Sequence, residues 1–116
     1  MNLVFYGTGK IEQGFALIGK TGQIRFKAAF ALSMGFKKDE RWLVGTDADE
    51  KPIKHIYIVR PKKEEQHNGF KMQYQNKSWF LSGRTLINEL KLNVPLKCHV
   101  EPFKKDNIDG FRLVLP

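Results

Sequence analysis

The sequence is poor in the residues that build disulfides and metal sites. It has one cysteine, Cys98, and three histidines among 116 residues. A lone cysteine cannot form an internal disulfide, and the strand-like run around Cys98 favours a buried thiol in a reducing compartment. No CxxC or HxxxH spacing is present to hold zinc. We therefore expect neither a metal nor another cofactor.

Long apolar runs are also missing. No stretch approaches the roughly 20 consecutive apolar residues that cross a membrane. The N-terminal sequence MNLVFYGTGK lacks the basic segment and the apolar core of a signal peptide. These absences predict a cytoplasmic protein without a membrane partner.

The side chains needed for nucleophilic catalysis are scarce and scattered. Such catalysis needs a nucleophile, a base and an orienting group close together in space. His55 and His67 are far apart in the sequence, and Cys98 and His99 are neighbours on an expected strand, so they point to opposite faces. The glycine-rich segments 7–10 and 19–22 lack the GxxxxGK[ST] spacing of a phosphate-binding loop. We expect a protein that is not an enzyme.

The charge of the chain is strongly unbalanced toward the basic side. The sequence holds 20 Lys and Arg against 12 Asp and Glu, a formal charge of +8, and its pI is about 9.7. A basic balance favours polyanionic partners such as nucleic acid or an acidic surface.

Apolar periodicity predicts the elements of the first half of the chain. Residues 15–18 and 23–26 alternate as a hairpin, and residues 27–34 follow the helical period with Phe30, Ala31 and Met34 on one stripe. Gly35 is in the position of a left-handed C-cap, with Phe36 able to fold back on the helix. Strands at 41–45 and 55–59 complete a ββαββ order.

The second half repeats this order. GFKMQYQNKSWFLS aligns with GFALIGKTGQIRFK, and residues 1–61 and 62–116 each carry 10 basic and 6 acidic residues. The sequence therefore predicts an α+β fold of two tandem ββαββ units packed as an intrachain pseudo-dimer, mainly antiparallel β with two short helices. The expected single domain, 1–116, comprises a first repeat at 11–61, a charged linker at 62–68 and a second repeat at 69–116. The alternative is two unrelated ββαββ segments.

Basic and aromatic residues alternate along several expected strands. Lys and Arg neutralise phosphates, and exposed aromatic rings stack on unpaired bases. The predicted nucleic-acid-binding residues are Lys20, Arg25, Lys27, Trp42, Lys71, Tyr74, Lys77, Trp79 and Arg84. The competing interpretation places the aromatic residues in the core.

The stretch 16–60 resembles the DNA-binding unit of the AbrB/MazE class of bacterial regulators and antitoxins. The matching segments are Gly22-Gln23-Ile24-Arg25-Phe26, Met34-Gly35-Phe36-Lys37-Lys38-Asp39 and Trp42-Leu43-Val44. The resemblance implies a swapped-hairpin barrel made by two copies, with Lys20, Arg25 and Lys27 facing DNA. Lys27 replaces the proline of that pattern and Gln23 its arginine. The ββββα order of 41–91 is similar to the repeat of the Whirly-type single-stranded-DNA-binding fold.

These observations lead to one main functional hypothesis and two alternatives. The first is a non-catalytic DNA-binding protein, a transcriptional regulator or an antitoxin-like factor. The second is a protein that binds single-stranded DNA or RNA by aromatic stacking. The third is a protein-interaction or structural module whose basic charge is incidental. Besides nucleic acid, a second copy forming a homodimer and an antitoxin-type protein partner are candidate partners.

Overall fold

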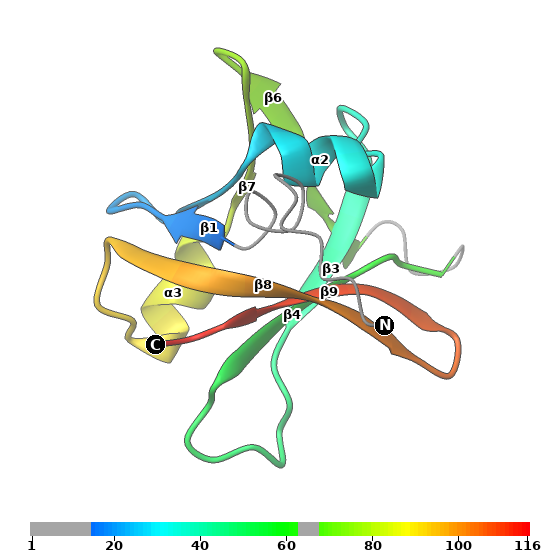
Figure 1. The fold of residues 1–116 in the computed structure, drawn as a ribbon. Helices are drawn as coiled ribbons and strands as arrows, with labels where there is room; N and C mark the ends of the chain where they lie inside the picture. The colour runs from blue at the N-terminus through cyan, green and yellow to red at the C-terminus, as the bar shows by residue number, and fades with distance from the viewer. Residues whose placement is uncertain (1–14, 63–67) are drawn as a thin grey trace, which may run out of the picture.

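A computed structural model describes residues 15–62 and 68–116 (Figure 1). The first five elements are β1 (Phe15–Ile18), β2 (Gln23–Phe26), α2 (Ala28–Met34), β3 (Arg41–Gly45) and β4 (His55–Val59). The other six are β5 (Phe70–Lys71), β6 (Gln73–Gln75), β7 (Ser78–Ser82), α3 (Arg84–Leu90), β8 (Leu96–Lys105) and β9 (Ile108–Val114). Residues 11–14 of the expected first repeat and 63–67 of the expected linker lie outside the described residues.

The local signals of the first half are confirmed. Every second residue is buried in β1, β2 and β4, as the two-residue period requires. Helix α2 ends at Gly35, which adopts the left-handed conformation with φ 66° and ψ 39°. The N–H of Phe36 donates to the carbonyl of Ala31 at 3.1 Å and that of Gly35 to the carbonyl of Leu32 at 3.2 Å, which is the Schellman arrangement.

The strands of residues 15–62 and 68–116 form one antiparallel sheet of nine strands in the order β5-β3-β4-β9-β8-β1-β2-β7-β6. Its first and last strands, β5 and β6, are separated in the chain by Met72 alone. The N–H of Met72 donates to the carbonyl of Glu40 at 2.7 Å, and the N–H of Asp39 donates to the carbonyl of Met72 at 2.9 Å. Residues 70–75 therefore join both ends of the sheet, which nearly closes into a barrel.

The expected packing of two ββαββ units is wrong. Strands of the first half pair with strands of the second: β1 with β8, β2 with β7, β3 with β5 and β4 with β9. Across the described residues the result is a single barrel-like sheet with two helices. Alternation along a strand specifies which face is buried, but it does not specify the neighbouring strand, so the sequence pattern left the pairing open.

Aromatic rings occupy the centre of the core. The ring centroid of Phe111 lies 4.9 Å from that of Phe30, 5.4 Å from Phe26 and 5.5 Å from Trp42. Phe30 comes from α2, so this helix covers part of the barrel interior (Figure 1). Among the described residues no helix is long and apolar enough to span a membrane.

The turn between β1 and β2 rests on the start of α3. Gly22 has φ +85°, and a Cβ added there would lie 2.5 Å from the Cα of Arg84. The carbonyl of Gly22 accepts from the N–H of Gly83 at 2.8 Å. Glycine is needed at this position both for its backbone conformation and for the close approach of the two chains. This contact fixes the hairpin that carries the candidate site.

Candidate nucleic-acid interface

Four neighbouring strands present one row of side chains on the outside of the barrel. Ala16, Ile18 and Ile24 are buried inside, so the alternate residues Leu17 and Arg25 face outward. Leu17 lies opposite Arg25 on β2 and opposite Lys97 on β8, and Arg25 lies opposite Phe80 on β7. Together the pairings place Lys97, Leu17, Arg25 and Phe80 side by side. The first three side chains are exposed, whereas Phe80 is only 5% exposed.

Three adjoining hollows surround Arg25 on this outer surface, which we call the β1–β2 surface. Their volumes are about 520, 220 and 90 Å³, and Arg25 lines all three. The basic residues that line them are Lys20, Arg25, Lys27 and Lys97. None of the described residues lining these hollows is acidic.

The four cations of the β1–β2 surface are exposed. Within residues 15–62 and 68–116, no carboxylate lies at ion-pair distance from any of them. Arg25 donates from Nε and Nη2 to Oε1 of Gln23, at 3.2 and 2.8 Å. These two bonds orient the guanidinium along β2 and leave three of its five N–H donors for a ligand.

An aromatic ring borders the surface at β1. The ring centroid of Phe15 lies 4.8 Å from that of His99, and Nζ of Lys97 lies 3.9 Å from the Phe15 centroid. Lys97 thus rests over the ring in a cation–π contact. The ring and the ammonium group are both within reach of a ligand that occupies the hollow at Leu17.

The structure brings together three of the predicted binding residues. Lys20, Arg25 and Lys27 share the β1–β2 surface. Arg84 is exposed at the first position of α3, beside the β1–β2 turn. Lys71 is exposed on β5 opposite Arg41.

The predicted aromatic residues are not part of this surface. Trp42 is fully buried, so the prediction that it binds nucleic acid is wrong: its ring is a core residue. Tyr74 and Trp79 pair across β6 and β7 with ring centroids 4.7 Å apart. Successive residues of a strand face opposite ways, so Trp79 points away from the face that carries Phe80 and Arg25. Lys77 lies in the turn between these two strands.

Sequence reasoning missed Lys97, Phe15 and Leu17. No local pattern marks them, because Lys97 stands 72 positions after Arg25 and reaches the surface only through the β1–β8 pairing. A correct strand order would have identified all three.

A further hollow of about 610 Å³ lies on the outer face of β3, β4, β8 and β9. Two basic residues, Lys105 and Arg112, line it, and Arg112 is neutralised by Glu101, whose Oε2 accepts from Nε at 2.8 Å. This hydrogen bond also raises the pKa of Arg112. Asp47 adds an acidic side chain to the lining. The β1–β2 surface is therefore better suited to a polyanion.

Comparison of the chain with family models, with curated protein sequences and with solved structures yields no match. The functional argument consequently rests on the residues of the β1–β2 surface.

Proposed function

We propose that this chain is a non-catalytic nucleic-acid-binding protein whose interface is the β1–β2 surface, with DNA as the expected polymer and a regulatory or antitoxin-like role. The observation that supports the proposal is the gathering of four exposed cations around hollows that share Arg25, with no carboxylate of the described residues at ion-pair distance from them. Phosphate oxygens would accept from these side chains.

The number of cations sets the expected salt dependence. Each phosphate neutralised on duplex DNA adds about 0.9 to the slope of log affinity against log salt, and each on a single strand adds about 0.7. Contacts from Lys20, Arg25, Lys27 and Lys97 therefore predict a slope of roughly 3 to 4.

Fluorescence anisotropy tests the proposal directly. Labelled duplex DNA, single-stranded DNA and RNA are titrated with the protein between about 50 and 200 mM salt. We expect binding whose slope falls by roughly 1.4 to 1.8 in the double variant Arg25→Ala with Lys27→Ala. Both side chains are exposed, so the melting temperature should change little.

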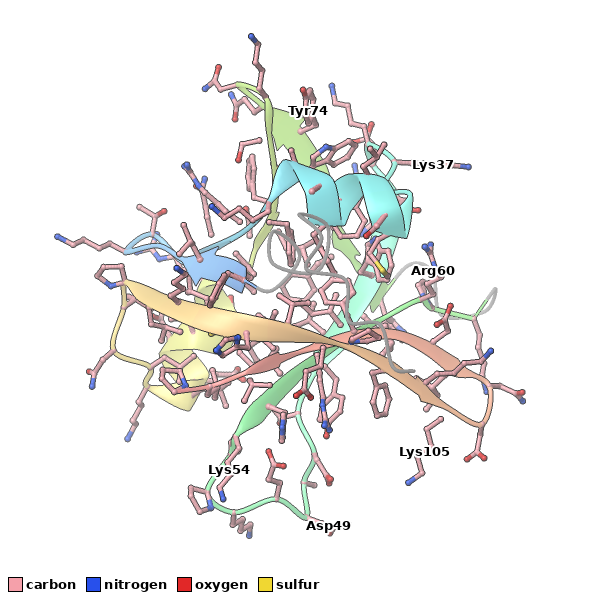
Figure 2. The ribbon with its side chains drawn as sticks, viewed as in Figure 1. Lys37, Asp49, Lys54, Arg60, Tyr74 and Lys105 are labelled. Carbon is pink, nitrogen blue, oxygen red and sulfur yellow. The ribbon has the colours of Figure 1, made fainter. Side chains whose placement is uncertain are left out.

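A matched control removes two cations elsewhere. Lys104 and Lys105 are exposed at the far end of β8, and Lys105 is about 26 Å along the strand from Lys97 (Figure 2). Replacing both with alanine removes the same charge and should leave most of the affinity. Equal losses in the two double variants would mean that only net charge matters. Absence of salt-dependent binding to every polymer would favour a protein-interaction role instead.

A further inference from the structure

From the apolar floor of the two larger hollows we infer that the β1–β2 surface binds an unpaired nucleic-acid strand, with bases seated in these two hollows and phosphates on the surrounding cations. This inference rests on the proposed nucleic-acid-binding function and specifies the form of the polymer. A duplex and a single strand both present phosphates to the cations. The preference of the surface for one or the other therefore depends on the side chains that lie between the cations.

Apolar side chains lie between the cations. Leu17 is 45% exposed although it stands between Arg25 and Lys97 on the neighbouring strands. The largest of these three hollows is also lined by Pro95, which is exposed, and by Leu96, which is half-buried. A duplex hides the flat apolar faces of its bases in the stack, whereas an unpaired strand can place them on such a floor.

The position of Arg25 suits a strand that crosses the sheet. Because Arg25 lines all three hollows, one guanidinium can hold a phosphate while the bases before and after it enter different hollows. The hollows extend from β8 across β1, β2 and β7 to Gln75 on β6, and the four spacings between these five strands make a width of about 19 Å. This width corresponds to the low end of the four to about 16 nucleotides that a single OB fold covers.

Phe15 supplies a second place for a base. In the free protein Lys97 covers one face of its ring, with Nζ 3.9 Å from the centroid. When Lys97 moves to a phosphate, that ring face becomes available for stacking. Binding therefore exchanges a cation–π contact for a charge-assisted hydrogen bond and a base–ring contact.

Three ligands of equal length test the inference on the unaltered protein. They are oligothymidylate of about ten nucleotides, the same strand without bases, and a duplex of matched length. We expect oligothymidylate to bind at least tenfold more tightly than the duplex, and the abasic strand to lose about tenfold per seated base. Oligouridylate of the same length, as a fourth ligand, tests whether the preferred strand is RNA or DNA.

Two leucine variants test whether the apolar side chains between the cations cause the preference for an unpaired strand. Leu17→Thr introduces a β-branched residue, which suits a strand, and removes apolar surface, so it should weaken binding of oligothymidylate several-fold without changing the salt slope. Leu32→Thr is the control, because Leu32 is 84% exposed on α2 and lines none of the three hollows. It should bind as the unaltered protein does.

The outcomes separate this inference from the proposed function. Tighter or equal binding of the duplex, with a slope that Arg25→Ala and Lys27→Ala reduce, would overturn the inference and leave the function standing. Equal binding of the abasic strand, or an unchanged affinity in Leu17→Thr, would also overturn it. If none of the four ligands binds with salt dependence, both fail.

Discussion

The side chain of Glu50 stabilises the loop between β3 and β4 with three hydrogen bonds. Its Oε1 accepts from the backbone N–H groups of Lys54 and His55 at 2.7 and 2.9 Å, and its Oε2 lies 2.8 Å from Nδ1 of His55. These bonds favour the carboxylate, and the Lys54 N–H contributes most, so the pKa of Glu50 lies below its usual value of 4.5. The loop lies at the bottom of the molecule in Figure 2, where Asp49 and Lys54 are labelled.

We expect Glu50→Gln to destabilise the protein at pH 7 and to destabilise it less at pH 3. A carboxylate with a depressed pKa contributes stability above about pH 4.5, and this contribution is lost as the pH falls through the folded-state pKa. Urea unfolding at both pH values measures the difference. Glu89→Gln, an exposed change on α3, is the matched control. A Glu50→Gln deficit that stays constant between pH 7 and pH 3 would contradict the expectation.

A residue of the candidate site could be predicted from the sequence where the local pattern shows which face of a strand is exposed. Arg25 alternates with Ile24 and Phe26, so its outward position followed from the period alone. Trp42 shows where this prediction fails. A tryptophan on an alternating strand can lie on the buried or the exposed face, and only the neighbouring strands decide which. Lys97 could not be placed, since its neighbour Leu17 is distant in the chain.

At the scale of elements, the hairpin of β1 and β2 depends on its contact with α3. The N–H of Gly19 donates to the carbonyl of Gln23 at 2.9 Å, and that of Gly22 donates to the carbonyl of Gly19 at 3.0 Å. The turn is thus internally bonded and docked on Gly83 through the Gly22 carbonyl. Lys20 lies in this turn, so its distance from Arg25 depends on the docking.

Gly22→Ala should cost roughly 1 to 3 kcal/mol or more of unfolding free energy. An alanine would have to adopt φ +85° and would meet the backbone of Arg84 at 2.5 Å. Denaturant unfolding measures this cost, and binding of oligothymidylate reports the displacement of Lys20. Gly45→Ala is the control, since nothing lies within 4 Å of a Cβ added there. Equal stability of the two variants would show that the turn can separate from α3 at little cost.

The elements themselves were largely predictable, whereas their arrangement was not. Periodicity placed β1, β2, β3 and β4 within the observed bounds, and Gly35 marked the end of α2. These signals are local. The sheet order depends on pairings between distant segments, and an alternating sequence such as that of β2 is compatible with β7 or with another neighbour.

At the scale of the whole molecule, Cys98 reports on the integrity of the barrel. Its thiol is fully buried beneath the β1–β2 surface, opposite Ala16, and burial raises its pKa to about 11. At pH 8 only about one thiol in a thousand is then ionised. Reaction with a thiol reagent requires the barrel to open.

We expect Cys98 to resist a disulfide reagent at pH 8 in the native state and to react in parallel with unfolding in urea. The rate at which the coloured product forms measures the reaction of the thiol. Leu32→Cys in a Cys98→Ala background is the control, because this exposed position should react at once. Rapid stoichiometric labelling of native Cys98 would mean that the β1–β8 pairing opens readily. The same assay verifies that each interface variant keeps a closed barrel.

The strand at 70–75, which pairs with β3 through β5 and with β7 through β6, has a kinetic consequence. The β5–β3 and β6–β7 pairings cannot both form until the other strands of the barrel are paired in register. One of those other pairings, between β1 and β8, joins Phe15 to His99, which are 84 residues apart in the chain. Contacts so distant in sequence make loop closure slow, and barrels of this kind fold in milliseconds to seconds. The segment around Met72 should therefore be among the last to order as the nascent chain folds.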